Sequence, residues 1–118
     1  MNSPIPKRGE IWDVNLDPTV GQEINKTRPA VVISTDALGK LRLKVIIPIT
    51  AWRPEFDGNR WHVKIVPHPT NGLTKDSVAD ALQIRSVGLE RFTKCRGRLA
   101  ALDLEEIAAA VATIIEFR

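Results

Sequence analysis

Arg28 is the residue of this chain that is best placed to bind a phosphate. It stands in Lys26-Thr27-Arg28-Pro29, where a polar loop, Asp17 to Thr27, meets the apolar run Ala30-Val31-Val32-Ile33. Pro29 fixes its own φ and disfavours a helical conformation at Arg28, so the chain here should be extended. The guanidinium would then stand at the foot of a strand, and its rigid fork of N–H donors matches the oxygens of a phosphate.

Further polar side chains are predicted near strand ends, on loops or on polar strand faces: Glu23, Thr50, Ser77, Gln83 and Arg85. Carboxylate, hydroxyl, amide and guanidinium groups can bind a polar substrate, and some of them can move its protons. Spacing alone does not identify the reaction that such a set would carry out.

Several familiar chemistries do not fit the motifs of this sequence. There is no Gly-x-Ser-x-Gly, and His62 and His68 stand where a surface histidine is the ordinary interpretation, so a serine hydrolase triad is not expected. Neither Gly-rich phosphate-binding motif occurs, which argues against a nucleotide cofactor. Cys95 is the only cysteine, so with two scattered histidines no ordinary zinc site is expected either. We therefore expect neither a metal nor a cofactor.

Length and composition indicate one globular domain over residues 1–118. Hydrophobic residues make up 43% of the chain and charged residues 26%, and no apolar run approaches the roughly 20 residues that cross a bilayer. The N-terminus lacks the apolar core of a signal peptide, and its two prolines predict a frayed lead-in over residues 1–7. No membrane association and a cytoplasmic location are expected.

The charge distribution favours a polyanionic partner. The net charge is +3, and the basic residues Arg85, Arg91, Lys94, Arg96 and Arg98 gather within fourteen residues that include only one acid, Glu90. A solvated basic rim is the alternative interpretation of that cluster.

Hydrophobic periodicity predicts a small, mainly antiparallel β domain with one long C-terminal helix. Strands are expected over residues 9–16, 30–34, 41–50, 61–66 and 77–87. The first is expected to be half-buried, with Trp12 on its apolar side. The helix is expected to begin at Asp103, with Glu106 completing a capping box and Leu102 packing against Ile107. Its apolar stripe consists of Leu104, Ile107, Val111, Ile114 and Ile115.

The ordered motifs of this chain resemble the MazF/PemK family of toxin endoribonucleases. The resemblance runs from Arg8 to the terminal helix, nearly the whole chain. It is carried by five blocks: Arg8-Gly9-Glu10-Ile11-Trp12; Asp17-Pro18-x-x-Gly21-Gln22-Glu23; Lys26-x-Arg28-Pro29-Ala30-Val31-Val32-Ile33-Ser34; Pro48-Ile49-Thr50; and Asp76-Ser77-Val78 with Gln83-Ile84-Arg85.

The resemblance implies a fold, an activity and partners. The fold would be a small SH3-like antiparallel β-barrel with a terminal helix, the MazF/CcdB-type toxin fold. The protein would be a homodimer that cuts single-stranded RNA at short sequences without a metal, and a cognate antitoxin would inhibit it. A basic groove further predicts that this antitoxin has an acidic, flexible tail that folds on binding.

The resemblance also implies roles for particular residues. Arg28 and Thr50 would be the catalytic pair and Glu23 a helper. The loop from Asp17 to Thr27 would flank the RNA groove and bring Lys26 and Thr27 to the RNA, together with Ser77. Gln83 and Arg85 would either contact RNA or hold the barrel rim or dimer. Ala51 replaces a serine that often follows the Pro-Ile-Thr block, which puts a secondary contact in doubt.

Metal-free RNA cleavage is chemistry that these side chains can serve. The ribose 2′-OH attacks the adjacent phosphorus and leaves a 2′,3′-cyclic phosphate and a 5′-OH end. Arg28 and Thr50 suit the stabilisation of charge on the phosphorane. Arginine is a poor base because its pKa lies above about 12. Glu23 is therefore the candidate base, or else a group that orients Arg28.

Other interpretations remain open at this point. A toxin of the same fold could bind gyrase instead of cutting RNA, although Ile114-Ile115-Glu116-Phe117-Arg118 shows no match to a gyrase-binding tail. A non-toxic SH3-like binding module is a third possibility. Trp12 and Trp61 are expected in the core, whereas Trp52 could stack on a base or seal an interface.

Overall fold

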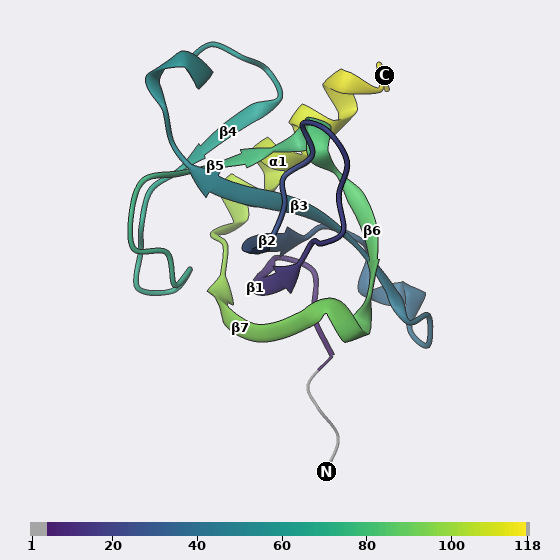
Figure 1. Cartoon of the computed structure of the whole chain (residues 1–118). Helices are drawn as coiled ribbons and strands as arrows, with labels where there is room; N and C mark the ends of the chain where they lie inside the picture. Colours follow the sequence, from purple (N-terminus) through teal and green to yellow (C-terminus); the bar gives the residue numbers. More distant parts are fainter. Residues whose placement is uncertain (1–4, 118) are drawn as a thin grey trace.

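The computed structural model describes residues 5–117, which form seven strands, four short 3-10 helices and one α-helix (Figure 1). The strands are β1 (Glu10–Asn15), β2 (Thr27–Val32), β3 (Leu43–Ala51), β4 (His62–Ile65), β5 (Ser77–Asp80), β6 (Arg85–Gly88) and β7 (Phe92–Arg98). The α-helix is α1 (Ala101–Ile114), and the 3-10 helices are η1 (Asp36–Leu38), η2 (Pro54–Phe56), η3 (Ala81–Gln83) and η4 (Leu89–Arg91).

The long strand β3 organises the sheet. All pairs are antiparallel, and the strand order is β4-β5-β3-β2-β1-β7. The first half of β3 also pairs with β6, and its last three residues pair with β5. The predicted mainly β fold with a terminal helix is confirmed, but the sheet does not close into a complete barrel. Instead, the loop after β4 is bonded to β7 through Arg98 N–H and Thr70 O, 2.7 Å apart.

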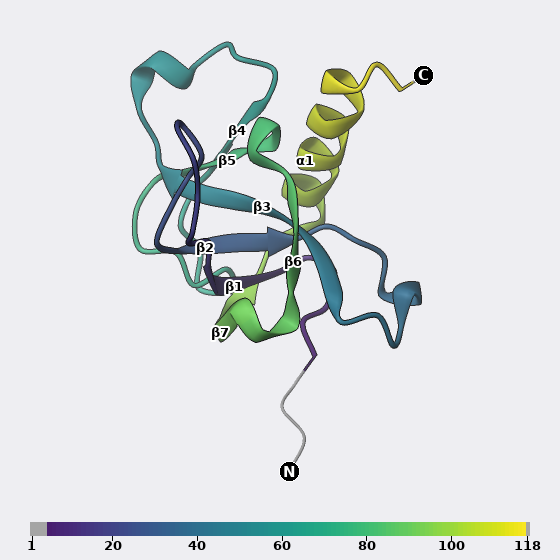
Figure 2. The ribbon, with the colours of Figure 1, turned by 45° about the vertical axis from the view of Figure 1, so that its right-hand side comes forward.

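Apolar side chains lie on both faces of the central strands. One cluster contains Ile11, Val31, Ile47 and Ile107 and lies under α1, which Figure 2 shows running along one side of the sheet. The other, on the opposite face, is built around Trp12, with Phe92 packed against it. The predicted half-buried pattern of β1 holds at Asp13 and Asn15, which are not buried, but it is wrong at Ile11, which is fully buried. Trp12 and Trp61 do pack with the core, as expected.

The helix begins earlier than its predicted cap. It starts at Ala101, and the N-cap Ala100 makes no side-chain capping bond. Leu99 is buried and its N–H bonds Gly9 O, so β7 has ended there and two alanines, strong helix formers, can start the helix. Asp103 lies in the first turn, where a carboxylate favours the helix dipole. Leu102 is 73% exposed and Ile115 is 64% exposed, so neither makes its predicted apolar contact.

One predicted strand is divided in the structure, and one strand was not predicted. Residues 77–87 are not one strand, because the Asp80 carboxylate accepts the Leu82 N–H and starts η3, which separates β5 from β6. The sequence predicted no strand after residue 87, but the basic segment that follows forms β7 and pairs with β1.

The predicted lead-in falls partly on residues 1–4, which lie outside the described residues. Of the remainder, Pro6 is buried, and Lys7 N–H donates to Glu10 Oε1 at 2.7 Å. Within residues 5–117, no helix is long and apolar enough to cross a membrane.

Candidate functional site

Arg28 and Thr50 line the same pocket, which has a volume of about 310 Å³. One wall comes from the facing ends of β2 and β3, a second from the loop that precedes β5, and a third from β7. The lining residues are Thr27, Arg28, Pro29, Ile49, Thr50, Ala51, Leu73, Thr74, Lys75, Ser77 and Arg96. Among these residues there are three cations and four hydroxyl groups but no carboxylate or imidazole. The pocket is therefore suited to an anion.

The register of the sheet explains why Arg28 and Thr50 meet. Ala30 lies opposite Pro48 in the β2–β3 pair, and the same register continued by two residues puts Arg28 opposite Thr50. Residues opposite each other in an antiparallel pair project from the same face. Both side chains are half-buried, and Arg28 Nε donates to Asn25 O at 3.2 Å, which holds the guanidinium at the strand end. The sequence-based placement of Arg28 at the foot of a strand is consistent with this geometry.

Ser77 lies in the pocket in a supporting position. It is 4% exposed, and its hydroxyl donates to Lys75 O at 2.9 Å. Ser77 therefore fixes the loop that carries Lys75 and has that donor already committed. Thr27, in contrast, lines the pocket with an exposed side chain.

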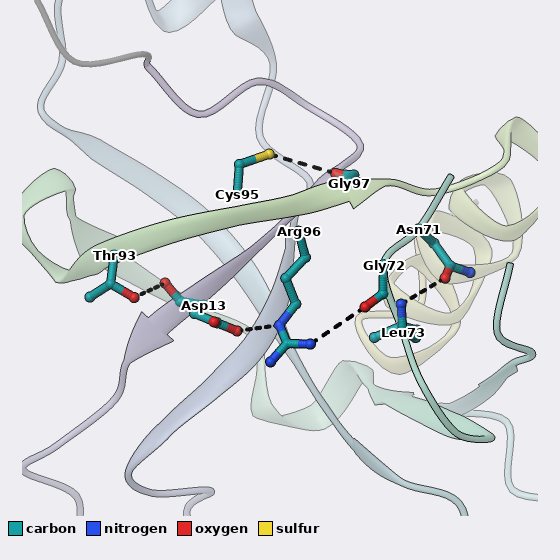
Figure 3. A network of polar contacts seen from close by, with 8 residues as sticks. All are labelled: Asp13, Asn71, Gly72, Leu73, Thr93, Cys95, Arg96 and Gly97. Carbon is teal, nitrogen blue, oxygen red and sulfur yellow. Dashed lines mark hydrogen bonds and ion pairs between the residues drawn. The ribbon is translucent and has the colours of Figure 1, made fainter. Parts of the chain in front are cut away.

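Arg96 is a pocket residue that no sequence pattern distinguished from its basic neighbours. Its Nε lies 2.5 Å from Asp13 Oδ1, and its Nη1 donates a long bond to Gly72 O at 3.4 Å (Figure 3). Alternation along β7 could not have identified it, because the pairing of β7 with β1 is irregular. Lys75 was missed for a similar reason, since a loop has no periodicity to interpret.

Glu23 and Lys26 do not line the pocket. The Glu23 carboxylate accepts the Val20 N–H at 2.6 Å within its own loop. Lys26 has a positive φ of 64°, and its N–H donates to Asp17 Oδ1 at 3.0 Å. The structure therefore places both residues on the loop between β1 and β2 but outside the pocket itself.

Gln83 and Arg85 hold that same loop. The Gln83 amide accepts Ile24 N–H at 3.1 Å and donates to Gln22 O at 3.3 Å, so it bonds two main-chain groups as a neighbouring strand would. Arg85 Nη1 donates to Leu16 O at 3.0 Å, at the beginning of the loop. These contacts assign Gln83 and Arg85 a supporting position in this structure, and neither lines the pocket.

Gln83→Leu is expected to loosen the loop without unfolding the sheet. Two hydrogen bonds of about 0.5–1.5 kcal/mol each are lost, so amide exchange at Ile24 should accelerate by about tenfold. Gln83→Glu keeps the acceptor and loses the donor, and it should show a smaller effect. Hydrogen exchange followed by NMR measures both, with the sheet amide of Ile33 as the internal reference. Unchanged amide exchange at Ile24 in Gln83→Leu would show that the two Gln83 hydrogen bonds are not needed to hold the loop.

Cys95 has no nucleophilic role in this pocket. It lies on β7 outside the lining residues, and desolvation, with the Glu10 carboxylate as a second cause, raises the pKa of its thiol. The reactive form of cysteine is the thiolate, which a raised pKa makes scarcer at neutral pH.

Trp52 comes directly after the pocket residue Ala51, and a lysine side chain lies over its ring. Lys64 Nζ lies 5.0 Å from the centroid of its ring, and Phe56 meets it edge to face with centroids 6.1 Å apart. Both interpretations of Trp52, stacking on a base and sealing an interface, stay predictions.

Comparison with known proteins places this chain in a known family. Residues 7–115 match the family described as PemK-like, MazF-like toxin of type II toxin-antitoxin system. Endoribonuclease MazF9 of Mycobacterium tuberculosis is 34% identical over 111 residues, which cover 89% of this chain and 92% of that protein. Endoribonuclease EndoA of Bacillus subtilis is 30% identical over 89 residues, covering 75% of this chain and 76% of that protein.

Solved structures show the same fold. MazF from Deinococcus radiodurans superposes with a TM-score of 0.83 at 24% identity and covers 98% of this chain and 100% of its own. An endoribonuclease from a Mycobacterial species, solved in complex with its cognate antitoxin, has a TM-score of 0.74 at 18% identity and covers 97% and 98%. The chain belongs to the PemK-like, MazF-like toxins of type II toxin-antitoxin systems.

Proposed function

We propose that this protein is an endoribonuclease that cleaves single-stranded RNA at short sequences, without a metal, and leaves 2′,3′-cyclic phosphate and 5′-OH ends. The observation that carries the proposal is the pocket that joins Arg28 and Thr50 with two further cations and contains no carboxylate. Carboxylates are the ligands by which proteins usually hold Mg²⁺, so this pocket is better suited to the phosphate itself than to a metal bound to it. The relatives named as endoribonucleases support the reaction class.

In the proposed reaction the substrate supplies its own nucleophile. The 2′-oxygen forms a bond to the adjacent phosphorus, the bond from phosphorus to the 5′-oxygen breaks, the 2′-OH loses its proton and the 5′-oxygen gains one. Negative charge on the phosphorane oxygens reaches its maximum between these steps. Arg28 donates two N–H groups to those oxygens and Thr50 donates its hydroxyl, so both stabilise the transition state more than the substrate.

A Glu23 variant tests whether the loop between β1 and β2 keeps its observed conformation when RNA is cleaved. Because its carboxylate bonds Val20 N–H outside the pocket, we expect Glu23→Gln to lower kcat by less than about threefold. A general base usually contributes about 10²–10⁴-fold. A loss of that size, together with loss of the acidic limb of the pH–rate profile, would instead make Glu23 the base and require the loop to close over the RNA. Glu55→Gln, on the exposed helix η2, is the control.

A cognate antitoxin is the proposed inhibitor. The family is defined by toxin-antitoxin pairs, and one structural relative was solved with its antitoxin. An acidic, flexible tail that folds onto the cations of the pocket would exclude RNA from it. The homodimer and the cytoplasmic location remain predictions from the sequence.

Purified protein incubated with a long single-stranded RNA in EDTA tests the proposed function. Fragments with 5′-OH ends that share a short sequence at the cut are expected. Intact RNA across varied sequences, with growth arrest on induced expression, would favour the gyrase-binding alternative. Intact RNA with normal growth would favour a non-toxic binding module.

A further inference from the structure

The edge strand β7 carries two bulges, and the extra residue of each bulge bonds Asp13 of β1. In its pairing with β1, Ile11 faces Gly97 and Trp12 faces Cys95, which leaves Arg96 without a partner. Asp13 faces Lys94 and Val14 faces Phe92, which leaves out Thr93. These two unpaired residues are the ones that bind Asp13: Arg96 through its carboxylate, and Thr93 through its main-chain carbonyl at 3.1 Å (Figure 3).

A bulge re-aims a side chain, and this one turns Arg96 toward the pocket. Bulges are frequent beside active sites because the extra residue is free of the ladder and its side chain can take a new direction. Arg96 lies on the pocket wall, and its side chain is one-third exposed. The neighbouring charged residue of β7, Arg98, follows the regular ladder and does not line the pocket.

The contacts of Arg96 fix the guanidinium but leave some of its N–H donors free to bind a ligand. A guanidinium has five N–H donors. Here Nε bonds Asp13 and Nη1 makes a long bond to Gly72 O, whereas Nη2 has no hydrogen-bond partner within residues 5–117. A planar group that is held along one edge can present its remaining donors to an anion with little loss of side-chain entropy.

The loop that carries Gly72 forms a firm support for this arrangement. A Cβ on Gly72 would clash with the main-chain carbonyl of Arg96, and a Cβ on Gly97 would clash with Thr70 O. Such close main-chain contacts, together with the Arg98 N–H bond to Thr70 O, attach the loop before Lys75 to β7. The pocket wall that contains Arg96 is therefore preorganised.

We propose that Arg96 is a second phosphate-binding residue of the pocket, which Asp13 positions, and that it binds the RNA phosphate next to the one held by Arg28 and Thr50. This inference rests on the proposed function. In the sheet, β1 separates β2 from β7, so two strand spacings of about 4.8 Å lie between the two main chains. The main chains that carry Arg28 and Arg96 are therefore roughly 10 Å apart, and we place Arg96 on the neighbouring phosphate rather than on the one held by Arg28.

Binding of an RNA that cannot be cleaved tests this directly. The probe is a fluorescent pool of randomised 2′-O-methyl RNA, which lacks the attacking hydroxyl, and anisotropy is measured over a range of salt concentrations. Arg96→Gln should weaken binding by about tenfold and make the slope of log K against log salt shallower by about 0.7, the value for one phosphate contact on a single strand. A salt-dependent contact of this kind is independent of base sequence.

Two control variants separate phosphate binding from a structural role. Asp13→Asn also breaks the ion pair but leaves the cation, so its salt slope should equal that of the wild type. Arg98→Gln removes an equal charge from the same strand outside the pocket, and its affinity should change by less than about twofold. If Arg96→Gln only lowers the melting temperature and matches Asp13→Asn in slope and affinity, Arg96 is a structural residue and the inference is wrong.

The wild-type protein provides a test that needs no folded variant. The Nε–H NMR resonance of Arg96 should shift when the RNA pool is added, and that of Arg98 should not; an unshifted Arg96 resonance overturns the inference. Wild-type protein that binds the pool but cuts no RNA would refute the proposed function and leave the role of Arg96 standing. Protein that cuts RNA but shows no binding of the pool, or no effect of Arg96→Gln on binding, would refute the role of Arg96 alone. Protein that neither binds the pool nor cuts RNA would refute both.

Discussion

Arg28→Ala is expected to reduce the single-turnover rate of RNA cleavage by about 10²–10³-fold, the usual cost of removing one donor that stabilises an oxyanion. The reason is geometric. Arg28 is fixed by its bond to Asn25 O beside Thr50, so it can meet the phosphorane without reorganising. Arg28→Lys keeps the charge but loses the planar fork, and it should recover only part of the rate. Quenched-flow measurements at saturating protein would report the chemical step apart from RNA binding.

Replacing a matched arginine outside the pocket shows whether the loss of cleavage rate is specific to the position of Arg28. Arg53, the N-cap of η2, is exposed and does not line the pocket, so Arg53→Ala should cut RNA within about twofold of the wild-type rate. Melting curves confirm that each variant is folded. A loss of less than about fivefold in folded Arg28→Ala would mean that another group stabilises the phosphorane, and Lys75 would be the next residue to test.

The sequence predicted the part of the pocket that regular strands build. Alternation and the Arg-Pro step located Arg28 and Thr50 at strand ends, and an antiparallel register was enough to bring them together. The sequence did not identify Lys75, because it lies on a loop, or Arg96, because it is the extra residue of a bulge. Neither residue belongs to the alternation of apolar and polar residues that reveals a strand in the sequence.

The loop between β1 and β2 shows a second limit. The family resemblance placed Glu23 and Lys26 at the RNA, and it left Gln83 and Arg85 either in contact with RNA or holding the barrel rim or dimer. In the structure the Gln83 and Arg85 side chains bond main-chain groups that lie about sixty and seventy residues away along the chain. Main-chain donors and acceptors are present at every residue, so no residue type marks where such a bond will form. The conformation of the loop, and with it the direction of Glu23, depends on those bonds.

Gly72→Ala is expected to destabilise the fold by about 3 kcal/mol, lower the melting temperature by roughly 10 °C and disturb the pocket in the same step. Gly72 has a φ of +70°, where an L-residue with a Cβ is strained by about 1–2 kcal/mol. The added Cβ would also clash with the main-chain carbonyl of Arg96, and strand β7 cannot move away without disturbing its pairing with β1. Overpacking of this kind usually costs about 1–3 kcal/mol more.

Comparison with Gly58→Ala separates the steric clash at Gly72 from the conformational strain. Gly58 has a similar φ of +84°, but no atom lies within 4 Å of its Cβ position, so only the conformational strain of about 1–2 kcal/mol should appear. The difference between the two variants in denaturant unfolding measures the contact between the loop and β7. Because Leu73, Thr74 and Lys75 follow Gly72 into the pocket wall, Gly72→Ala should also slow cleavage at temperatures where it is fully folded, and Gly58→Ala should not. Equal stability of the two variants would show that the loop yields easily, and a yielding loop could not preorganise Arg96.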